Sequence, residues 1–408
     1  MKLEPIITSL LMNDTYKATM GKVLHNQFSD ANVIWNYKNR DADTRKFTPE
    51  MVDEIKEQIK YFCTLKFTNE ELSWMDETMP WLGKTYITTL KQFQADYDWY
   101  DISYDKETQQ IKVVIEGPQY LTEWCETPTM TIISTVWFKM ALTDKEYSSA
   151  EAELYKRTEE KIDKLVNAEW AMGFVSDFGL RRCFSIKSME KILKMIIDTS
   201  SAFVGTKFVG TSCMYFAKKF GIKPMGTMAH SYLETVGQGY PEYNPAYTNK
   251  RAMNAWVKEY GVENGIYLTD VIGTDVFLKD FTKEYATLFS GVRHDSGDPF
   301  EWGEKIIKHY EKLGINPKTK TLLFSDSLNF DKAATLFAVF NDRINVAFGI
   351  GTYITCDTNV KHMNQVLKIV KVNGRDVAKL SDTPGKTMCL DSNYVEYLQR
   401  SIDWRLSH

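Results

Sequence analysis

The chain has 408 residues, a composition ordinary for a soluble globular protein, and a formal net charge of −4. The charge balance argues against nucleic acid or an anionic membrane as a partner, and no apolar stretch is long enough to span a bilayer. The six cysteines are scattered, which argues against a zinc site. With no signal-peptide pattern near the start of the sequence, we expect reduced thiols in a cytoplasmic protein.

The first 128 residues mix strand and helix patterns. Residues 32–37 alternate apolar and polar side chains, which predicts a half-buried strand, and residues 49–62 have helical spacing. Residues 111–115 predict a second strand that stops at Gly117 and Pro118. The stretch 67–104 is rich in Trp and Tyr, and we expect it to form core or an oligomer face.

From about residue 128 to 356 the pattern changes to short apolar runs that end in polar or glycine residues. Helical patterns follow most of them, for example at residues 301–313 and 331–340. Such repeated βα units predict a parallel sheet, and about seven of them favour an α/β barrel. An open doubly wound sheet is the alternative, but the chain lacks its G-x-G-x-x-G fingerprint. The seven runs are residues 174–179, 208–212, 225–230, 265–270, 289–293, 322–326 and 344–349.

The carboxyl ends of barrel strands form the active-site face. We therefore expect polar residues at the ends of these runs to surround one cavity. They are Asp177, Ser212, His230, Asp270, Arg293, Asp295, Asp326 and Gly351.

His230 is the strongest single candidate for chemistry. It follows small residues in the run 225–230, at an expected strand end, where a large ligand could reach it. A neutral imidazole can act as an acid, a base or a nucleophile that accepts a phosphoryl group. The alternative is a histidine with a purely structural role.

The segment 293–298 is the densest polar cluster of the sequence. Arg293 could hold a carboxylate or phosphate through two hydrogen bonds, and Asp295 and Asp298 could hold Mg²⁺ or ribose hydroxyls. A structural Arg–Asp pair is the alternative. His294 is expected to point away from the site, because side chains alternate along a strand.

Two later segments predict phosphate or ribose binding. The amides of Gly349 and Gly351 and the hydroxyl of Thr352 could surround an anion, although a tight turn would also explain them. Ser325 and Asp326 suit a ribose or phosphate group, or could cap the next helix.

An aromatic residue precedes two arginines in the segment 176–182. Phe178 could stack on a flat ring while Arg181 or Arg182 contacts an anionic group. Two solvated arginines at the start of a helix are the alternative.

Taken together in this order, the motifs resemble the nicotinate phosphoribosyltransferase family, specifically its bacterial, ATP-coupled type. The resemblance covers nearly the whole chain. The motifs are LLMNDTYK (10–17), DFGLRR (177–182), FVGT (203–206), GTS (210–212), MGTMAH (225–230), RHDSGDP (293–299), FSD (324–326), FGIGT (348–352) and AKLSDTPGK (378–386). Cys213 stands where the family usually has Asn, which leaves a side-chain role at that position in doubt.

The resemblance implies the type II phosphoribosyltransferase fold. Residues 1–128, joined by residues 365–408, would form an α/β sandwich domain, and residues 129–364 an irregular, incomplete α/β barrel. It also implies a homodimer with shared active sites.

The implied reaction joins nicotinate and phosphoribosyl pyrophosphate to nicotinate mononucleotide and pyrophosphate, in NAD biosynthesis. ATP hydrolysis would be coupled through a phosphohistidine at His230, as in an ATP-dependent ligase. Mg²⁺ would be held mainly by substrate phosphates rather than by protein side chains.

The resemblance also assigns roles to residues. His230, Arg293 and Asp295 would be catalytic, with Arg293 the first candidate for the nicotinate carboxylate. Nicotinate would lie between Phe178 and Tyr16 of the other subunit. The substrate-binding set is Tyr16, Phe178, Arg181, Arg182, Ser212, Thr227, Ser325, Asp326, Gly349, Gly351 and Thr352.

Three alternatives remain at this stage. One is nicotinamide phosphoribosyltransferase, in which an acidic group would bind the amide nitrogen, whereas Arg181 and Arg182 favour an acid substrate. Quinolinate phosphoribosyltransferase is shorter and needs no such histidine. A non-catalytic nucleotide-binding dimer would be expected to lack one of these motifs.

Overall fold

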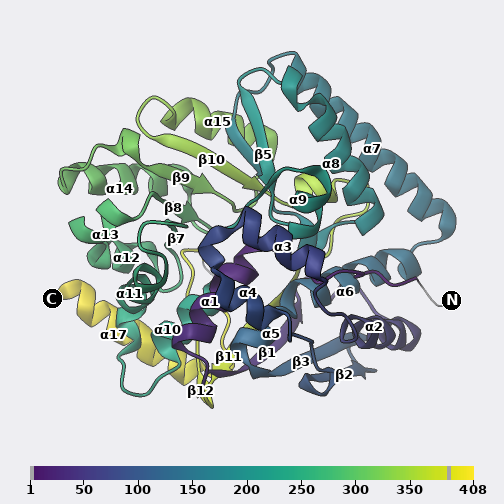
Figure 1. Cartoon of the computed structure of the whole chain (residues 1–408), viewed down its shortest axis with the longest axis horizontal. Coiled ribbons are helices and arrows are strands. Elements are labelled where there is room, and N and C mark those ends of the chain that lie inside the picture. The colour runs from purple at the N-terminus through teal and green to yellow at the C-terminus, as the bar shows by residue number, and fades with distance from the viewer. Residues whose placement is uncertain (1–3, 384–386) are drawn as a thin grey trace.

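The structure is a computed structural model that describes residues 4–383 and 387–408. Pro384, Gly385 and Lys386 of the AKLSDTPGK motif and residues 1–3 of the expected first domain lie outside the described residues. The strands form two sheets, one antiparallel and one parallel, with helices around them (Figure 1).

The antiparallel sheet has five strands in the order β12-β11-β1-β3-β2 and joins the two ends of the chain. Trp35 of β1 pairs with Ile115 of β3 on one side and with Ile369 of β11 on the other. Both predicted strands are confirmed, but β3 continues to Pro118, which pairs with Asn32 at the end of the ladder. The strands are β1 (Asn32–Asn39), β2 (Tyr100–Asp105), β3 (Gln110–Pro118), β11 (Gln365–Val372) and β12 (Arg375–Asp376).

The helix predicted over residues 49–62 is confirmed at both ends as α2. The Thr48 hydroxyl accepts a hydrogen bond from the Met51 amide, and Pro49 occupies the first helical position. The aromatic stretch 67–104 packs into the core, where Tyr86 and Tyr100 are buried. The helices before the parallel sheet are α1 (Thr15–Gln27), α2 (Pro49–Phe62), α3 (Asn69–Thr78), α4 (Lys84–Leu90), α5 (Gln119–Thr122), α6 (Glu126–Ala141) and α7 (Asp144–Val166).

The parallel sheet has seven strands in the order β6-β5-β4-β10-β9-β8-β7. Its edge strands β6 and β7 do not pair with each other, so the expected incomplete α/β barrel is confirmed. Six of the seven predicted runs contain strands at their expected places. The strands are β4 (Gly173–Asp177), β5 (Thr206–Thr211), β6 (Lys223–Pro224), β7 (Ile266–Leu268), β8 (Gly291–His294), β9 (Thr321–Phe324) and β10 (Asn345–Ile350).

The remaining run, residues 225–230, was predicted wrongly as a strand. Only Lys223 and Pro224 pair with β5, and His230 begins a helix instead of ending a strand. The physical reason lies at Gly226, where an added Cβ would be 2.9 Å from the Tyr16 amide nitrogen. The start of α1 therefore packs directly against this segment, just beyond the last residue that pairs with β5.

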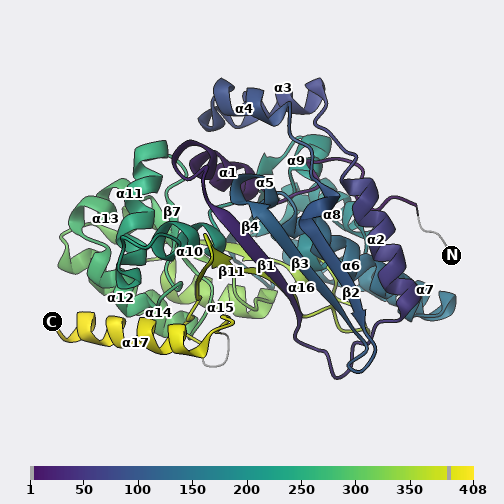
Figure 2. The same cartoon turned by 90° about the horizontal axis from the view of Figure 1, so that it is seen from below.

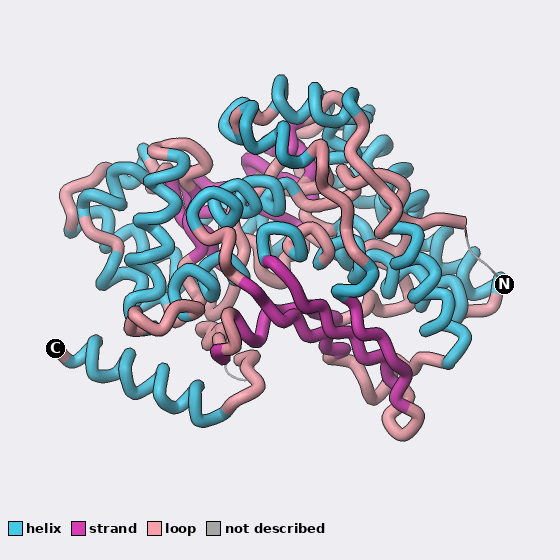
Figure 3. Tube along the Cα trace, turned by 60° about the horizontal axis from the view of Figure 1, so that its bottom comes forward, coloured by secondary structure: helices cyan, strands magenta, loops and turns pink. Residues whose placement is uncertain are grey.

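Helices surround the parallel strands, as Figures 2 and 3 show from two further directions. The predicted helices 301–313 and 331–340 are α14 and α15. Helix α17 packs on α12 and on the short helix η5, alongside the barrel, whereas β11 and β12 join the antiparallel sheet. The helices are α8 (Ile186–Thr199), α9 (Met214–Phe220), α10 (His230–Gln238), α11 (Thr248–Tyr260), α12 (Thr274–Asp280), α13 (Lys283–Leu288), α14 (Pro299–Lys312), α15 (Phe330–Phe340), α16 (Thr352–Thr355) and α17 (Ser392–Ser407).

Short 3₁₀ helices complete the chain. They are η1 (Pro80–Leu82), η2 (Tyr97–Trp99), η3 (Leu180–Arg182), η4 (Ser200–Ala202), η5 (Pro245–Tyr247) and η6 (Pro317–Thr319). Across the described residues, no helix combines the length and apolarity needed to cross a membrane. The six cysteines are all free thiols.

Candidate active site

A cavity of about 610 Å³ opens at the carboxyl ends of the parallel strands and is also lined by residues of the antiparallel sheet. It brings together thirteen of the fourteen residues to which the family resemblance assigns a catalytic or substrate-binding role. Thr227 is the exception and does not line it. The thirteen are Tyr16, Phe178, Arg181, Arg182, Ser212, His230, Arg293, Asp295, Ser325, Asp326, Gly349, Gly351 and Thr352.

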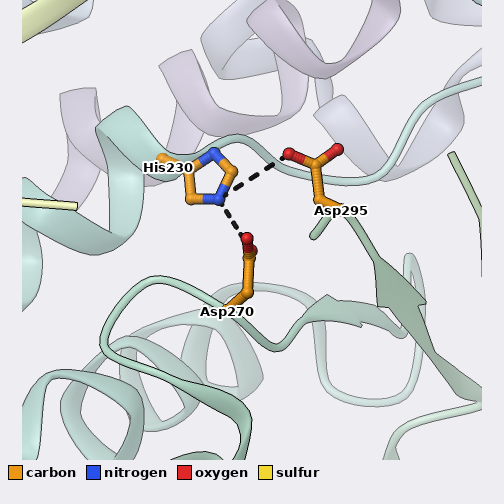
Figure 4. A group of neighbouring side chains, drawn as sticks. All are labelled: His230, Asp270 and Asp295. Atoms are coloured by element: carbon orange, nitrogen blue, oxygen red, sulfur yellow. Dashed lines mark hydrogen bonds and ion pairs between the residues drawn. The ribbon is translucent and has the colours of Figure 1, made fainter. Parts of the chain in front are cut away.

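His230 lies at the start of α10 beside two carboxylates (Figure 4). Its Nε2 is 2.8 Å from Asp270 Oδ1 and 3.9 Å from Asp295 Oδ2. Burial, and then the charge of Lys379, lower the pKa of His230 to about 4, while His230 and Lys379 hold the pKa of Asp270 well below its usual range. The imidazole is therefore neutral at pH 7 and donates its Nε2 proton to an ionised Asp270.

This hydrogen bond leaves the other ring nitrogen available. Among the described residues, none makes a hydrogen bond to Nδ1 of His230, and the side chain lines the cavity. With the proton on Nε2, Nδ1 carries a lone pair and can act as a nucleophile. Asp270 lies behind the histidine, and neither Asp270 nor Asp177 lines the cavity, although the sequence predicted that both would.

Lys379 completes the group on the side of the carboxylates. Its Nζ is 2.9 Å from Asp270 Oδ2 and 3.7 Å from Asp295 Oδ2. The oxygen and nitrogen atoms of His230, Asp270 and Asp295 lie within 4.8 Å of one another, close enough in principle for a metal. Because the Lys379 ammonium group already pairs with both carboxylates, these residues do not fit a dedicated Mg²⁺ cage.

Arg293 is fixed from one side and open on the other. Its Nη1 donates to Thr227 Oγ1 (2.6 Å) and to the Met228 carbonyl (2.9 Å), so Thr227 positions the arginine from outside the cavity. Nη2 is 3.8 Å from Asp295 Oδ1 and makes no hydrogen bond with the described residues. The open edge of the guanidinium can bind a carboxylate or phosphate.

Asp298, the other acid of the 293–298 cluster, has a structural role. Its carboxylate accepts hydrogen bonds from the Phe300 and Glu301 amides and caps α14. It does not line the cavity, so the expectation that it holds Mg²⁺ or ribose is wrong.

The two neighbouring arginines differ in their surroundings. The Arg181 side chain is 38 % exposed and lies near two acids, with Nε 3.8 Å from Asp14 Oδ2 and Nη1 3.5 Å from Glu126 Oε1. Arg182 donates from Nε and Nη2 to the Gln365 carbonyl at 3.1 and 2.8 Å. Arg182 thus fastens β11 to the barrel, and Arg181 is the freer guanidinium of the pair.

Phe178 and Tyr16 line the same cavity within one chain. The Phe178 ring packs so closely on Gly349 that a Cβ there would be 2.4 Å from two ring carbons. Gly349 is therefore required for the ring's position. Although Tyr16 was expected from the other subunit, its own chain places it in this cavity, with its hydroxyl donating to Asp14 Oδ2 at 3.1 Å.

Asp14 is satisfied by several donors. Besides Tyr16, it accepts hydrogen bonds from Ser212 Oγ (2.6 Å) and Thr127 Oγ1 (3.0 Å). The neighbouring Cys213 is fully buried in a small apolar cluster and does not line the cavity. Burial raises the pKa of its thiol well above the usual value, so Cys213 packs as an apolar residue.

The two phosphate-type segments also face the cavity. Ser325 Oγ lies 3.2 Å from Asp295 Oδ1 and donates to the His294 carbonyl at 2.9 Å. Asn329, and not Ser325 or Asp326, caps α15. After Gly351, Ile354 is the first residue of α16 to donate within the helix, which leaves earlier amides for an anion.

Sequence reasoning missed several cavity residues. Lys368 and Lys379 line the cavity, as do Glu234 and Arg40. Lys368 had a usable signal, since it is a lysine within the apolar strand QVLKIVKV. Glu234 follows His230 by four residues, which places both on one face of a helix, but the sequence analysis predicts that His230 ends a strand.

Comparison with solved structures identifies the class of fold. The chain is similar to the nicotinate phosphoribosyltransferase of Vibrio cholerae, with a TM-score of 0.90, 30 % identity, and coverage of 98 % of this chain and 94 % of that one. It is also similar to the Porphyromonas gingivalis enzyme of the same name, with a TM-score of 0.88, 28 % identity, and coverage of 97 % and 100 %. The fold is thus that of a phosphoribosyltransferase.

Sequence comparison is more specific. The nicotinate phosphoribosyltransferase (NAPRTase) N-terminal domain matches residues 11–134, and the nicotinate phosphoribosyltransferase (NAPRTase) family matches residues 174–405. A protein of that name from Ralstonia pickettii is 38 % identical over 396 residues, covering 97 % of this chain and 98 % of its own length. One from Acinetobacter baumannii is 37 % identical over 401 residues, covering 98 % and 97 %. The chain belongs to the nicotinate phosphoribosyltransferase family.

Proposed function

We propose that this protein transfers the phosphoribosyl group of phosphoribosyl pyrophosphate to nicotinate, in NAD biosynthesis. The pyridine nitrogen forms a bond to C1 of the ribose as the bond from C1 to the pyrophosphate oxygen breaks, and pyrophosphate leaves. The observation that carries the proposal is the meeting of Phe178, Tyr16 and Arg293 in one cavity with the Gly349–Thr352 loop. A flat anionic ring and a phosphorylated sugar need these groups together.

Nicotinate fits between the Phe178 and Tyr16 rings, with Arg293 as the first candidate for its carboxylate. Arg181, which is partly exposed, is available to the same carboxylate or to a phosphate. The amides near Gly351 and the Thr352 hydroxyl suit the 5-phosphate, and Ser325 and Asp326 suit the ribose and its phosphate. Fixed donors of this kind stabilise charge that develops as pyrophosphate departs.

The geometry favours nicotinate over nicotinamide as the substrate. An amide nitrogen would need an acceptor beside the Tyr16 ring, and Asp14, the acid next to that ring, already accepts hydrogen bonds from Tyr16, Thr127 and Ser212. Arg293 in contrast offers an Nη2 that makes no hydrogen bond with the described residues, although it lies 3.8 Å from Asp295 Oδ1. An anionic carboxylate matches this arrangement better than a neutral amide.

We further propose that ATP is coupled to the reaction through His230. Nδ1 attacks the γ-phosphorus of ATP, the bond to the bridging oxygen breaks, and ADP leaves. Asp270 holds the Nε2 proton and stabilises the charge that the ring acquires. Mg²⁺, bound through the ATP and pyrophosphate oxygens, would supply charge neutralisation there. Asp295, which lines the cavity, is placed to contact such an ion.

Coupling requires that phosphorylated and free His230 bind the substrates differently. Phosphorylation adds up to about two negative charges next to Lys379 and Asp295. Pyrophosphate leaving beside His230 would meet that altered charge. We also infer a homodimer with shared active sites, and a cytoplasmic location, from the family relationship.

A competition assay tests the proposed transfer. With equal nicotinate and nicotinamide and limiting phosphoribosyl pyrophosphate, we expect nicotinate mononucleotide as the main product, measured by chromatography. Preferential formation of the nicotinamide product would contradict the assigned carboxylate site. Binding of phosphoribosyl pyrophosphate without pyrophosphate release would instead support the non-catalytic alternative.

A further inference from the structure

Glu234 is a buried acid in the cavity wall that the proposed reaction does not use. It lies one helical turn after His230 on α10, is 1 % exposed, and lines the cavity. Its Oε2 is buried and has no hydrogen-bond partner among the described residues. A buried carboxylate without a donor is costly as an anion, so its environment must supply charge or a proton.

The nearby cations are not dedicated to Glu234. Lys379 is already paired with Asp270 and Asp295. Lys368 on β11 has no ion pair within 4 Å among the described residues, although its charge acts on Glu234. Both lysines line the cavity, where an anionic ligand would compete with Glu234 for them.

The remaining charges around Glu234 are acidic or neutral. The negative charges of Glu126 on α6 and of Asp270, which follows β7, oppose the ionisation of Glu234. The charge of Glu234 in turn opposes the ionisation of Tyr394 on α17. Burial is the largest effect and raises the pKa of Glu234 to about 7, while Lys368 and Lys379 act against this rise. Burial also lowers the pKa of Lys368 to about 8. If the positive charge of either lysine no longer acted on Glu234, the carboxylate would therefore shift toward its neutral form.

We propose that Glu234 is a proton-linked counter-ion of the phosphate subsite: its carboxylate faces Lys368 and Lys379 when the subsite is empty, and it takes up one proton from solvent when a pyrophosphate-type anion binds there. The inference rests on the proposed position of pyrophosphate beside His230. No other bond changes, and release of the anion returns the proton. Affinity for the anion therefore falls as pH rises through the pKa of Glu234.

Calorimetry of pyrophosphate binding tests this in buffers of different ionisation enthalpy. The wild type is compared with Glu234→Gln and with the matched control Glu263→Gln, an exposed residue that does not line the cavity. At pH 7.5, we expect the wild type and the control to take up about three quarters of a proton more per site than Glu234→Gln. The difference between variants removes the protons that pyrophosphate itself exchanges.

A second readout is the pH dependence of affinity. Between pH 7 and pH 8 the wild-type affinity should fall about fivefold more than that of Glu234→Gln. If Glu234→Gln does not fold, the proton uptake that accompanies sulfate binding to the wild type is measured instead of the difference between the two variants. Sulfate has no ionisation in this pH range, so any proton taken up goes to the protein.

Equal proton uptake by the wild type and Glu234→Gln, or none by the wild type with sulfate, would overturn the inference and leave the proposed transfer standing. Failure of pyrophosphate to bind the wild type would overturn both the inference and the placement of pyrophosphate beside His230. Turnover of nicotinate, measured separately, distinguishes this second case from loss of the enzyme's activity.

Discussion

The hydrogen bond between His230 and Asp270 decides which ring nitrogen can react. Asp270 accepts the Nε2 proton, so the lone pair is on Nδ1, toward the cavity. Burial of the ring lowers its pKa to about 4, which keeps that lone pair available throughout the neutral range. A histidine that was protonated at pH 7 could not accept a phosphoryl group.

Asp270→Asn tests this arrangement directly. The asparagine keeps the shape but can donate to Nε2, which would move the ring proton to Nδ1 and remove the nucleophile. We expect phosphorylation of His230 by ATP to slow on the order of 10²–10⁴-fold. The measurement is acid-labile phosphate on the protein in a single turnover, alongside nicotinate affinity, which should hardly change.

Ser296→Ala is the matched control, since Ser296 donates to the other oxygen of Asp270 and its loss leaves the charge in place. It should slow phosphorylation far less than Asp270→Asn. A wild-type rate in Asp270→Asn would show that Asp270 does not set the tautomer.

Strand β10 and the segment after β4 position the aromatic part of the site. Gly349 in β10 pairs with Ser176 in β4, and the Phe178 ring packs directly on Gly349. The glycine therefore sets the ring's position through the space it leaves empty. This packing role adds to the sequence-based prediction that the Gly349 amide contacts phosphate, which stays a prediction.

Gly349→Ala should displace the Phe178 ring, because the added Cβ would be 2.4 Å from ring carbons. Overpacking of this kind destabilises by about 1–3 kcal/mol. We expect a KM for nicotinate raised about tenfold or more, on the order of 1.4 kcal/mol, with a smaller effect on ATP hydrolysis. Steady-state kinetics measure both.

A second substitution makes the result specific. In the Gly349→Ala background, Phe178→Leu should relieve the clash and recover stability that the single change lost, a coupling visible in a double-mutant cycle. Additive effects of the two substitutions, or an unchanged KM in Gly349→Ala, would contradict the packing account.

The repeating elements could be predicted from sequence, whereas side-chain geometry could not. Short apolar runs that end in polar residues predicted six barrel strands, because burial requires that pattern in any parallel sheet. The run before His230 has the same pattern, yet contact with α1 at Gly226 makes it a loop. Local periodicity carries no information about a neighbour two hundred residues away.

For the candidate site too, the sequence predicts which segments meet but not what each side chain does. Strand ends converge in a barrel, so the sequence could predict that Arg293, Asp295 and Ser325 lie close together. The choice between cap and ligand could not be made, since Asp298 caps a helix while Asp326 lines the cavity. The place of Lys379 depends on how the segment after β12 returns to the barrel, which sequence spacing does not determine.

At the scale of the whole molecule, a buried ionic network joins the N-terminal helices to the barrel. Lys17 of α1 is fully buried and forms ion pairs with Glu123 and Glu126. Glu126 also lies 3.5 Å from Arg181 at the cavity. The amide of Thr15 donates to the Ser212 carbonyl at 2.7 Å, so α1 is tied to the end of β5 as well.

Lys17→Met should therefore destabilise the whole fold, because Glu123 loses its ion pair and Glu126 keeps only the longer one to Arg181. Breaking a buried pair in this way costs about 3–5 kcal/mol. The free energy of unfolding in urea measures the loss. The control is Lys60→Met, whose half-exposed pair with Glu57 should contribute less than about 1 kcal/mol. A loss of similar size in both variants would show that the buried network stabilises the fold no more than an exposed ion pair does.

We propose that energy coupling takes place at His230, separately from substrate binding around Phe178 and Arg293. Formation of nicotinate mononucleotide with and without ATP, in the wild type and in His230→Ala, tests that separation most directly. We predict that ATP stimulates the wild type, and that His230→Ala keeps a slow, ATP-independent transfer and acquires no acid-labile phosphate. ATP stimulation retained in His230→Ala, or phosphohistidine still formed in it, would contradict the central claim.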